Sequence, residues 1–572
     1  MVSAKGLSSR VSFKAEQWLL GTAALVFGAW FVGISNIPPS ATEWLERGDI
    51  GTQYVAWQFF RNSPLLQWPI TAIPQYGSGW GTIVPGAAGN ALAAIPAKYL
   101  TRWFDGEFQY FAIWILLSFV LQALISVRIL RLFSLSQAQR VLGTIVLTVS
   151  PVFIFRLGMT HLDLASHWML LLAILLYFNA NRHFPWLVLI SASIAVALYL
   201  SVMVVGFWVA WLVQRSVVEP LTRRERPNVA EIIRVGVFGI ATIAISMWVL
   251  GLFSLAESSR GAGFFRLNVL AWANSDFSSG DSYSFLARQI PYLRNRQLFA
   301  EEGEGFAYLG SISVAALPTL VVMAIRYRAT VVRKMLPITL IAFAFWLFAV
   351  SNRVVIGRTE FTLWAPQVVT EIRQVFRATP RFAWPLSYLV IIGGWVSIAR
   401  LSRRVNSAVA IVALSLLVML HVIDSAPGIH WSHERLSSSE PSTNRLLSKD
   451  WEEIFIERSA ISLVPSIDLQ LDSDDAAVAA WIDSGRWMDI LNFASKKNLT
   501  LNFAYQGRSR GDLANRATTK ARGELLSGEL RSGVVYFFST EAEWSLASRQ
   551  LSNERLARII DGYHVILGPE ER

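Results

Sequence analysis

Long apolar runs recur along the first 424 residues of the chain and constrain its fold more than any other feature. About 20 apolar residues in a helix span ~30 Å of hydrocarbon, and a helix satisfies its own backbone hydrogen bonds there. The sequence therefore predicts an α-helical polytopic membrane protein. Runs of this length, or slightly shorter, occur at about 17–38, 108–132, 139–156, 162–180, 231–255, 306–326, 335–351, 383–400 and 407–424.

The composition agrees with this class. Hydrophobic residues make up 53% of the chain and charged residues 16%, whereas a soluble domain carries about 25% charged residues. The net charge of +11 would suggest nucleic acid in a soluble protein, but here the basic residues cluster at the ends of apolar runs, where they meet lipid headgroups. We expect membrane lipids and no nucleic acid as partners. The absence of cysteine excludes disulfides, thiolate nucleophiles and cysteine-based metal sites.

The basic residues also predict the topology. Lys5, Arg10 and Lys14 place the N-terminus in the cytoplasm under the positive-inside rule. An apolar run at 186–213 is too long for one span, and the later basic loops fall on the cytoplasmic side only if this run is a hairpin of two short helices. We therefore expect about eleven spans and an extracytoplasmic C-terminus. The first run lacks a small-x-small cleavage site before Pro38-Pro39 and is predicted to be an uncleaved anchor.

This topology predicts a membrane domain over 1–425, a serine-rich linker over 426–450 and an extracytoplasmic domain over 451–572. In the first outer loop, the spacing of YVAWQFF (54–60) and several tryptophans favour short helices in the headgroup zone, with a solvated loop as the alternative. The polar sequence of the membrane domain is concentrated in outer loops at 39–107, 256–305 and 352–382.

The tail alternates strand and helix patterns and predicts a small α/β domain. It contains no phosphate loop, nucleophile elbow or metal motif, so we expect it to bind substrate or a partner. The expected strands are 459–467, 499–505, 533–538 and 562–568, and the expected helices are 483–497, 514–530 and 541–551.

Asp49 directly follows the first span, in ERGDIGTQYVAWQFFRNSP. An acid at the membrane surface can act as a base on a lipid-borne substrate, and ionisable groups at this depth are functional candidates because they are costly. The structural alternative is a helix cap for the segment that follows.

A second group of candidates lies where two spans meet, in SPVFIFRLGMTHLDLASHWM (150–169). On a helix starting near Thr160, Asp163 and His167 would share a face, while His161 would lie on another side. We interpret the three as substrate-binding residues. A metal site and a hydrogen-bonded polar network are the alternatives, although the spacing matches no metal motif.

The third group is made of outer arginines. Arg377 and Arg381 would project side by side if Pro380 allows a helix, and Arg353 lies across the same loop. Arg266 is a further outer cation. Guanidinium groups bind phosphate oxygens bidentately, so these residues are candidates for holding a phosphate, with headgroup snorkelling as the alternative.

Several strings resemble a family of bacterial polytopic proteins of otherwise unknown function within the GT-C type of membrane glycosyltransferase. They are GDIGTQYVAWQFFRNSPL, QYGSGWGTIV, FRLGMTHLDLASHW, GFFRLNVLAW, EGFAYLG and FRATPRFAWP, and the resemblance covers most of 40–400.

The resemblance implies an inverting transferase that moves a sugar from a polyprenyl-phosphate or diphosphate carrier to a lipid-linked or surface glycan. It further implies the bacterial inner membrane as the location, Asp49 as general base, and Gln53 and Tyr76 among the substrate-binding residues. The sequence departs from the superfamily because Glu46 and Asp49 are separated by two residues, which puts a paired role in doubt.

The expected reaction requires no cofactor, and a divalent cation held weakly near Glu46 and Asp49 stays open. A transporter or flippase of lipid-linked glycans and a membrane acyltransferase are the alternative functions. The halves of the chain show no self-similarity of the kind that a transporter favours, and the cytoplasmic loops offer an acyltransferase only scattered arginines.

Overall fold

The computed structural model describes residues 4–46, 48–104, 106–255, 265–277, 281–289, 303–438, 445–467, 475–507, 511–551 and 554–571. These residues form two compact units, each assembled from separate stretches of sequence. The first unit consists of Met1–Ile37, Phe111–Ile245 and Gly261–Ser438. The second unit consists of Pro38–Tyr110, Ser246–Arg260 and Ser439–Arg572.

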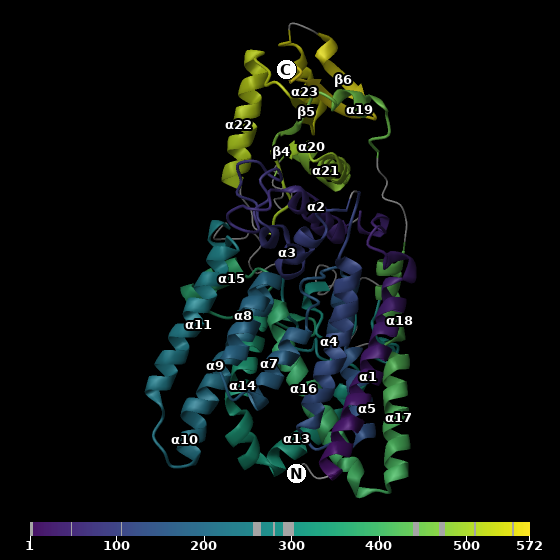
Figure 1. The fold of residues 1–572 in the computed structure, drawn as a ribbon, viewed down its shortest axis with the longest axis vertical. Helices are drawn as coiled ribbons and strands as arrows, with labels where there is room; N and C mark the ends of the chain where they lie inside the picture. The colour runs from purple at the N-terminus through teal and green to yellow at the C-terminus, as the bar shows by residue number, and fades with distance from the viewer. Residues whose placement is uncertain are drawn as a thin grey trace. The chain divides into compact units, whose positions relative to one another are not determined.

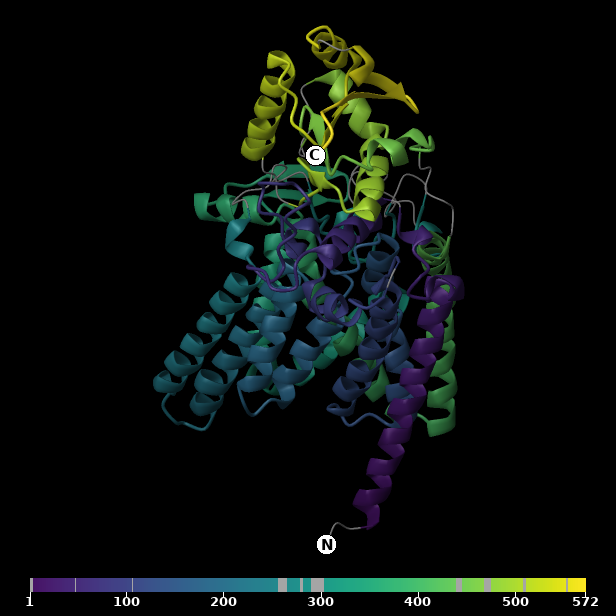
Figure 2. The same cartoon turned by 45° about the horizontal axis from the view of Figure 1, so that its top comes forward.

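The first unit is a bundle of helices (Figure 1, Figure 2), and it also contains one small hairpin. Its hairpin pairs β1 (Arg353–Ile356) with β2 (Thr359–Thr362) in antiparallel register. Its helices are α1 (Ala4–Val32), α4 (Phe111–Arg131), α5 (Gln137–Thr148), α6 (Pro151–Gly158), α7 (Trp168–Asn179), α8 (Phe184–Val196), α9 (Leu198–Val213), α10 (Glu219–Thr222), α11 (Val229–Val249), which continues into the second unit, α13 (Ser311–Arg326), α14 (Arg328–Val350), α15 (Gln367–Val375), α16 (Trp384–Leu401), α17 (Ser407–Asp424) and α18 (Ala426–Ser437).

Eight segments in the described part of the chain are long and apolar enough to cross a membrane, which confirms the predicted class. The count of eleven spans stays a prediction, because α7, α8 and α13 are apolar but shorter. The eight are Ser12–Val32, Phe111–Arg131, Gln137–Gly158, Leu198–Thr222, Val229–Val249, Arg328–Val350, Thr379–Arg404 and Ser407–Asp424.

Local sequence explains where several helices begin and how they pack. Ser136 and Gln139 form a reciprocal capping box at the start of α5. Extended backbone at Ala197 separates α8 from α9, which confirms that the run at 186–213 is not one helix. A Cβ on Gly143 would lie 2.1 Å from the indole nitrogen of Trp395, so glycine lets α5 approach α16 closely.

The second unit contains a five-stranded sheet of order β4-β3-β5-β7-β6. Strand β3 runs parallel to both β4 and β5, and β7 runs antiparallel to both β5 and β6. This confirms the predicted α/β character of the tail. Its strands are β3 (Ala460–Val464), β4 (Thr500–Leu501), β5 (Val534–Phe538), β6 (Ala557–Ile560) and β7 (Tyr563–Leu567), and its helices are α19 (Asp450–Ile454), α20 (Ala476–Asp483), α21 (Arg486–Lys497), α22 (Gly511–Ser527) and α23 (Glu541–Ser548).

The first outer segment packs against this tail domain. It contributes α2 (Gly48–Asn62) and α3 (Ala91–Leu100), and α2 contacts α21. The backbone N–H of Leu501 donates to the carbonyl of Gln75 at 2.8 Å, and the N–H of Ser78 donates back to Leu501 at 2.6 Å. The compact units therefore differ from the linear division at 425, because 39–107 groups with the tail.

The structure adds detail to two connecting segments. Every residue of α2 from Ile50 to Phe60 is buried in the protein, and the position of α2 in the headgroup zone stays a prediction. The first half of the expected linker is a helix, α18, whose residue Leu436 accepts a hydrogen bond from Asn36 at 3.0 Å. Residues 439–444 lie outside the described residues, as do 256–264, 278–280 and 290–302 of the second outer loop.

Candidate functional site

The first unit holds a group of charged side chains in its interior, which we call the charge cluster: Arg156, His161, Asp163, Glu304 and Arg381. Arg156 lies in the last turn of α6, and His161 and Asp163 lie in the irregular stretch that follows it. Glu304 lies in the short 3-10 helix Gly303–Gly305, and Arg381 lies in another, Thr379–Ala383.

Glu304 is the centre of the charge cluster. Its carboxylate accepts two hydrogen bonds from Arg381, from Nε at 2.7 Å and from Nη2 at 2.5 Å. Nη1 of Arg156 donates to the same carboxylate at 3.0 Å. The Arg156 side chain is 1% exposed and the Glu304 side chain 9%, so these charges are largely removed from water. Two cations therefore share the one carboxylate of Glu304.

Aromatic rings flank both guanidinium groups. Arg381 lies 4.6 Å from the ring centre of Tyr199, and Arg156 lies 5.2 Å from that of Trp384. Nε of Arg156 is buried without a hydrogen-bond partner in the described structure. The bonds to Glu304 use Nε and Nη2 of Arg381 and leave its Nη1 for a further acceptor. The cluster thus retains donor capacity for another anion.

Asp163 and Glu304 differ in their electrostatic surroundings. Burial raises the pKa of Asp163 above its ordinary value, against the opposing charges of His161 and Arg381. Burial would also raise the pKa of Glu304, but the charges of Arg156 and Arg381 hold it well below its ordinary value. The surrounding cations therefore favour the charged form of Glu304, whereas burial favours the neutral form of Asp163. Such a separation of two carboxyl pKa values is typical of acid–base sites.

The conformation of residues 160–167 differs from the prediction. These residues form turns, Thr160 has a φ of 59°, and the helix α7 begins only at Trp168. Asp163 and His167 consequently do not share a helix face, and the prediction that they do is wrong. A left-handed residue without glycine is uncommon and marks a backbone held by its surroundings.

The two histidines have different partners. Nδ1 of His161 lies 3.0 Å from Nη1 of Arg156 and 3.7 Å from the carboxylate of Glu304. His167 is fully buried and lies 2.9 Å from the hydroxyl of Tyr388, with its ring 4.4 Å from Trp384. His161 therefore belongs to the charge cluster, and His167 belongs to an adjoining aromatic network.

The predicted arginine pair is also separated. Arg377 lies outside any helix, 6.0 Å from the ring centre of Phe265, whereas Arg381 enters the charge cluster. Their expected side-by-side projection from one helix is therefore wrong, since Arg377 precedes the 3-10 helix that begins at Thr379 and carries Arg381.

Arg266 and Arg353 meet at another carboxylate. Both pair with Glu360 of β2, and Nε of Arg353 donates to Glu360 at 2.8 Å. Arg353 is at the first position of β1, and its register partner in the hairpin is Thr362. These two cations are thus brought together, but around Glu360 and not around Glu304.

The remaining predicted residues lie in the second unit. Asp49 is exposed in the first turn of α2, where a carboxylate also stabilises the helix dipole. Gln53 is buried in the same helix. The hydroxyl of Tyr76 is fully buried and accepts a hydrogen bond from the backbone N–H of Tyr505 at 2.9 Å. Tyr76 therefore joins the first outer segment to the tail domain.

Glu46 has a partner that the sequence did not indicate. Nζ of Lys496 lies 2.5 Å from the carboxylate of Glu46 and 3.3 Å from that of Glu107. Glu107 also accepts hydrogen bonds from Tyr54 at 3.2 Å and from Thr42. Among the described residues no group of three or more histidine, aspartate or glutamate side chains is arranged to hold a metal ion.

Sequence reasoning missed Arg156 and Glu304. Arg156 sits inside an apolar run, and a charge in such a run was the available signal. Glu304 opens the string EGFAYLG, but it is 77 residues from Arg381 in sequence, and no local pattern links the two.

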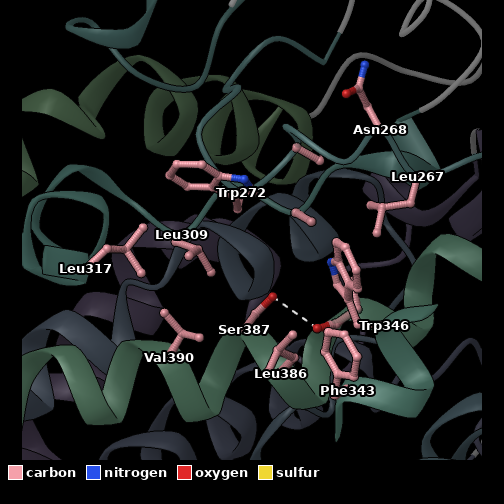
Figure 3. Close-up of a pocket in the computed structure, with 13 residues that line it drawn as sticks. Leu267, Asn268, Trp272, Leu309, Leu317, Phe343, Trp346, Leu386, Ser387 and Val390 are labelled. Carbon is pink, nitrogen blue, oxygen red and sulfur yellow. Dashed lines mark hydrogen bonds between the residues drawn. The ribbon is translucent and has the colours of Figure 1, made fainter. Parts of the chain in front are cut away.

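An apolar pocket with a volume of about 260 Å³ lies among α13, α14 and α16 (Figure 3). Trp272, Phe343 and Trp346 contribute its largest side chains, and Ala383, at the end of the 3-10 helix that carries Arg381, also lines it. Asn268 and Ser387 are its polar members, and Ser387 is already bonded to the carbonyl of Ala383 at 3.1 Å. This lining suits an apolar ligand.

Comparison with known proteins gives two matches. Residues 20–426 match a family described as a domain of unknown function (DUF6311), and residues 450–568 match the DUF6311 C-terminal domain. No curated protein matches the chain. Because the first match alone covers more than half of the 572 residues, the chain belongs to the DUF6311 family.

Proposed function

We propose that the protein is an inverting membrane glycosyltransferase of the GT-C type. It moves a sugar from a polyprenyl-phosphate or diphosphate carrier to a lipid-linked or surface glycan at the outer face of a bacterial inner membrane. The N-terminus is cytoplasmic and the tail domain extracytoplasmic in this proposal. The observation that carries it is the charge cluster, which combines a proton-accepting carboxylate with two cations able to bind a departing phosphate.

The two arginines would stabilise the phosphate as it leaves the sugar. When the bond between the anomeric carbon and the phosphate oxygen breaks, that oxygen takes the electron pair and becomes more negative. The bonds from Arg381 to Glu304 do not use its Nη1 group, and Arg156 adds a second positive charge beside it. Preorganised donors in a water-poor place stabilise developing charge far better than water does.

A carboxylate would take the proton from the acceptor hydroxyl. The acceptor hydroxyl must lose its proton as its oxygen attacks the anomeric carbon, and one base without a covalent intermediate gives inversion. Asp163 is suited to this role because it lies among the cations and has a raised pKa. Asp49, the base implied by the family resemblance, is proposed from sequence alone and remains the second candidate.

The apolar pocket supports a lipid-linked donor. Its wall includes Ala383, only two residues from Arg381, so a phosphate near Arg381 would have an apolar surface within reach of its lipid tail. A water-soluble nucleotide sugar would gain nothing from this lining.

The test uses purified protein in liposomes with a panel of radiolabelled polyprenyl-phosphate sugars and a glycan-lipid extract as acceptor. Asp163→Asn and Asp49→Asn are compared with wild type and with Glu225→Gln, an exposed carboxylate in the loop before α11. General-base help is worth roughly 10²- to 10⁴-fold, so the variant that removes the base should lose at least 100-fold in turnover.

Retention of wild-type turnover by both aspartate variants would exclude both as bases. Movement of the intact carrier across the liposome membrane without sugar transfer would favour the flippase alternative. For the cations, Arg381→Gln should weaken donor binding at least tenfold while Arg377→Gln serves as the matched control, because Arg377 lies outside the charge cluster.

A further inference from the structure

The segment between α14 and α16, residues 351–378, has a surface that the proposed function does not use. We call it the connecting segment. Candidate membrane spans precede and follow it directly, Arg328–Val350 and Thr379–Arg404, and it contains no candidate span itself. Its two ends must therefore lie at the same face of the membrane.

One side of α15 is apolar and exposed. Trp364 is 86% exposed, Val368 63% and Ile372 46%, and they follow one another at intervals of four residues. This spacing places Val368 and Ile372 on one helix face, with Trp364 leading into it. Groups of this size seldom face water together in a folded protein without a binding role.

A buried arginine on another side of α15 attaches this helix to the protein. Arg373 is 6% exposed and donates a hydrogen bond to the side-chain oxygen of Asn352. Thr370 and Gln374 are exposed on the side opposite Val368. The helix is therefore held by Arg373, with its apolar side turned outward.

The adjoining hairpin adds positive charge. Arg353 is 45% exposed although it pairs with Glu360, and Arg358 is exposed at the hairpin turn. The connecting segment carries four arginines and two glutamates, so it is net positive. Arginine beside exposed tryptophan and aliphatic side chains is typical of helices that lie in a lipid headgroup layer.

We propose that the connecting segment binds the surface of the membrane, with Trp364, Val368 and Ile372 inserted at the boundary between headgroups and acyl chains. The exposed arginines contact the phosphates of anionic phospholipids. Continuity with two membrane spans favours lipid over a protein partner, because chain connectivity alone keeps this surface at the bilayer face.

The test uses the natural absence of cysteine, which allows a nitroxide to be attached at single introduced positions. Full-length Trp364→Cys, Val368→Cys, Ile372→Cys, Thr370→Cys and Gln374→Cys proteins are labelled and placed in nanodiscs of phosphatidylglycerol or of phosphatidylcholine. All five positions are exposed, so the substitutions should leave folding unchanged, which size-exclusion chromatography verifies. Electron paramagnetic resonance then measures the collision of each label with oxygen and with a water-soluble nickel chelate.

The expected ratio of oxygen to nickel collisions is at least fivefold higher at 364, 368 and 372 than at the matched controls 370 and 374, and higher in phosphatidylglycerol than in phosphatidylcholine. Equal ratios at all five positions would show that the face is in water. Low collision rates with both reagents would show that protein covers it. Equal depth in the two lipids would overturn the assignment to anionic headgroups.

Discussion

Replacement of Glu304 by glutamine should destabilise the first unit strongly. Glutamine has nearly the same shape but no charge, so Arg156 and Arg381 would remain as two buried cations without a counter-ion. Its amide N–H₂ would also face guanidinium donors where a carboxylate oxygen now accepts.

The magnitude follows from burial. Removing one partner of a buried ion pair costs about 3–5 kcal/mol. Arg156 is 1% exposed and should contribute a cost within this range, whereas Arg381 is 14% exposed and should add less because water can screen it. We expect a loss of about 4 kcal/mol in the free energy of unfolding.

Reversible unfolding by sodium dodecyl sulfate in mixed micelles, followed by circular dichroism, measures this free energy. Glu225→Gln is the matched control and should change it by less than about 0.5 kcal/mol. The double variant Glu304→Gln with Arg381→Gln should cost at least about 1 kcal/mol less than the sum of the two single variants, because one uncompensated cation is removed. A loss below about 1 kcal/mol in Glu304→Gln would refute the reasoning, since the pairs would then contribute like exposed ones.

Three further predictions concern the second unit. Tyr76→Phe removes the acceptor for the Tyr505 N–H and should cost about 1 kcal/mol, with faster amide hydrogen exchange at Tyr505 than at Leu463, whose N–H bonds to Asn502; unchanged exchange at Tyr505 would contradict it. Lys496→Met should lower the free energy of unfolding by no more than about 1 kcal/mol, because the Lys496 side chain is 40% exposed. This loss in the free energy of unfolding should become smaller in high salt, which screens the ion pairs. A loss that does not depend on salt would indicate that Lys496 acts through packing. Burial lowers the pKa of Lys98 from 10.5 to about 8. The folded protein therefore releases the ammonium proton of Lys98 at a lower pH than the unfolded chain does. The free energy of unfolding should consequently rise between pH 8 and 10.5, by about 3 kcal/mol at most. Lys98→Met should abolish that rise in pH-dependent denaturation, and an identical rise in the variant would assign it to other groups.

Periodicity predicted the elements that are long or strongly alternating. The apolar runs became helices at the expected places, and β3, β5 and β7 lie within the expected strands. β6 was missed because Ala557–Ile560 is short and mostly exposed, which weakens the alternation that would reveal it. The hairpin β1–β2 was missed for a similar reason, since all four residues of β2 are exposed.

The charge cluster was only partly predictable. Asp163, His161 and Arg381 were candidates because polar residues at the ends of apolar runs are conspicuous. Residues 160–167 were expected to be helical, but the left-handed Thr160 interrupts the helix, and local propensity does not encode that conformation. Glu304 became recognisable only when tertiary structure placed it against Arg156 and Arg381.

The joining of the first outer segment to the tail has a consequence for synthesis. Tyr76 and Tyr505 are bonded although 429 residues separate them. At roughly 5–20 residues per second, the ribosome needs about 20–90 s to make that stretch. Throughout this interval the eleven consecutive residues of α2 that end up buried have no finished tail domain to pack against. Nascent chains should therefore expose part of this helix to chaperones and proteases for tens of seconds, and premature termination before α21 should leave the side of α2 that contacts α21 permanently uncovered.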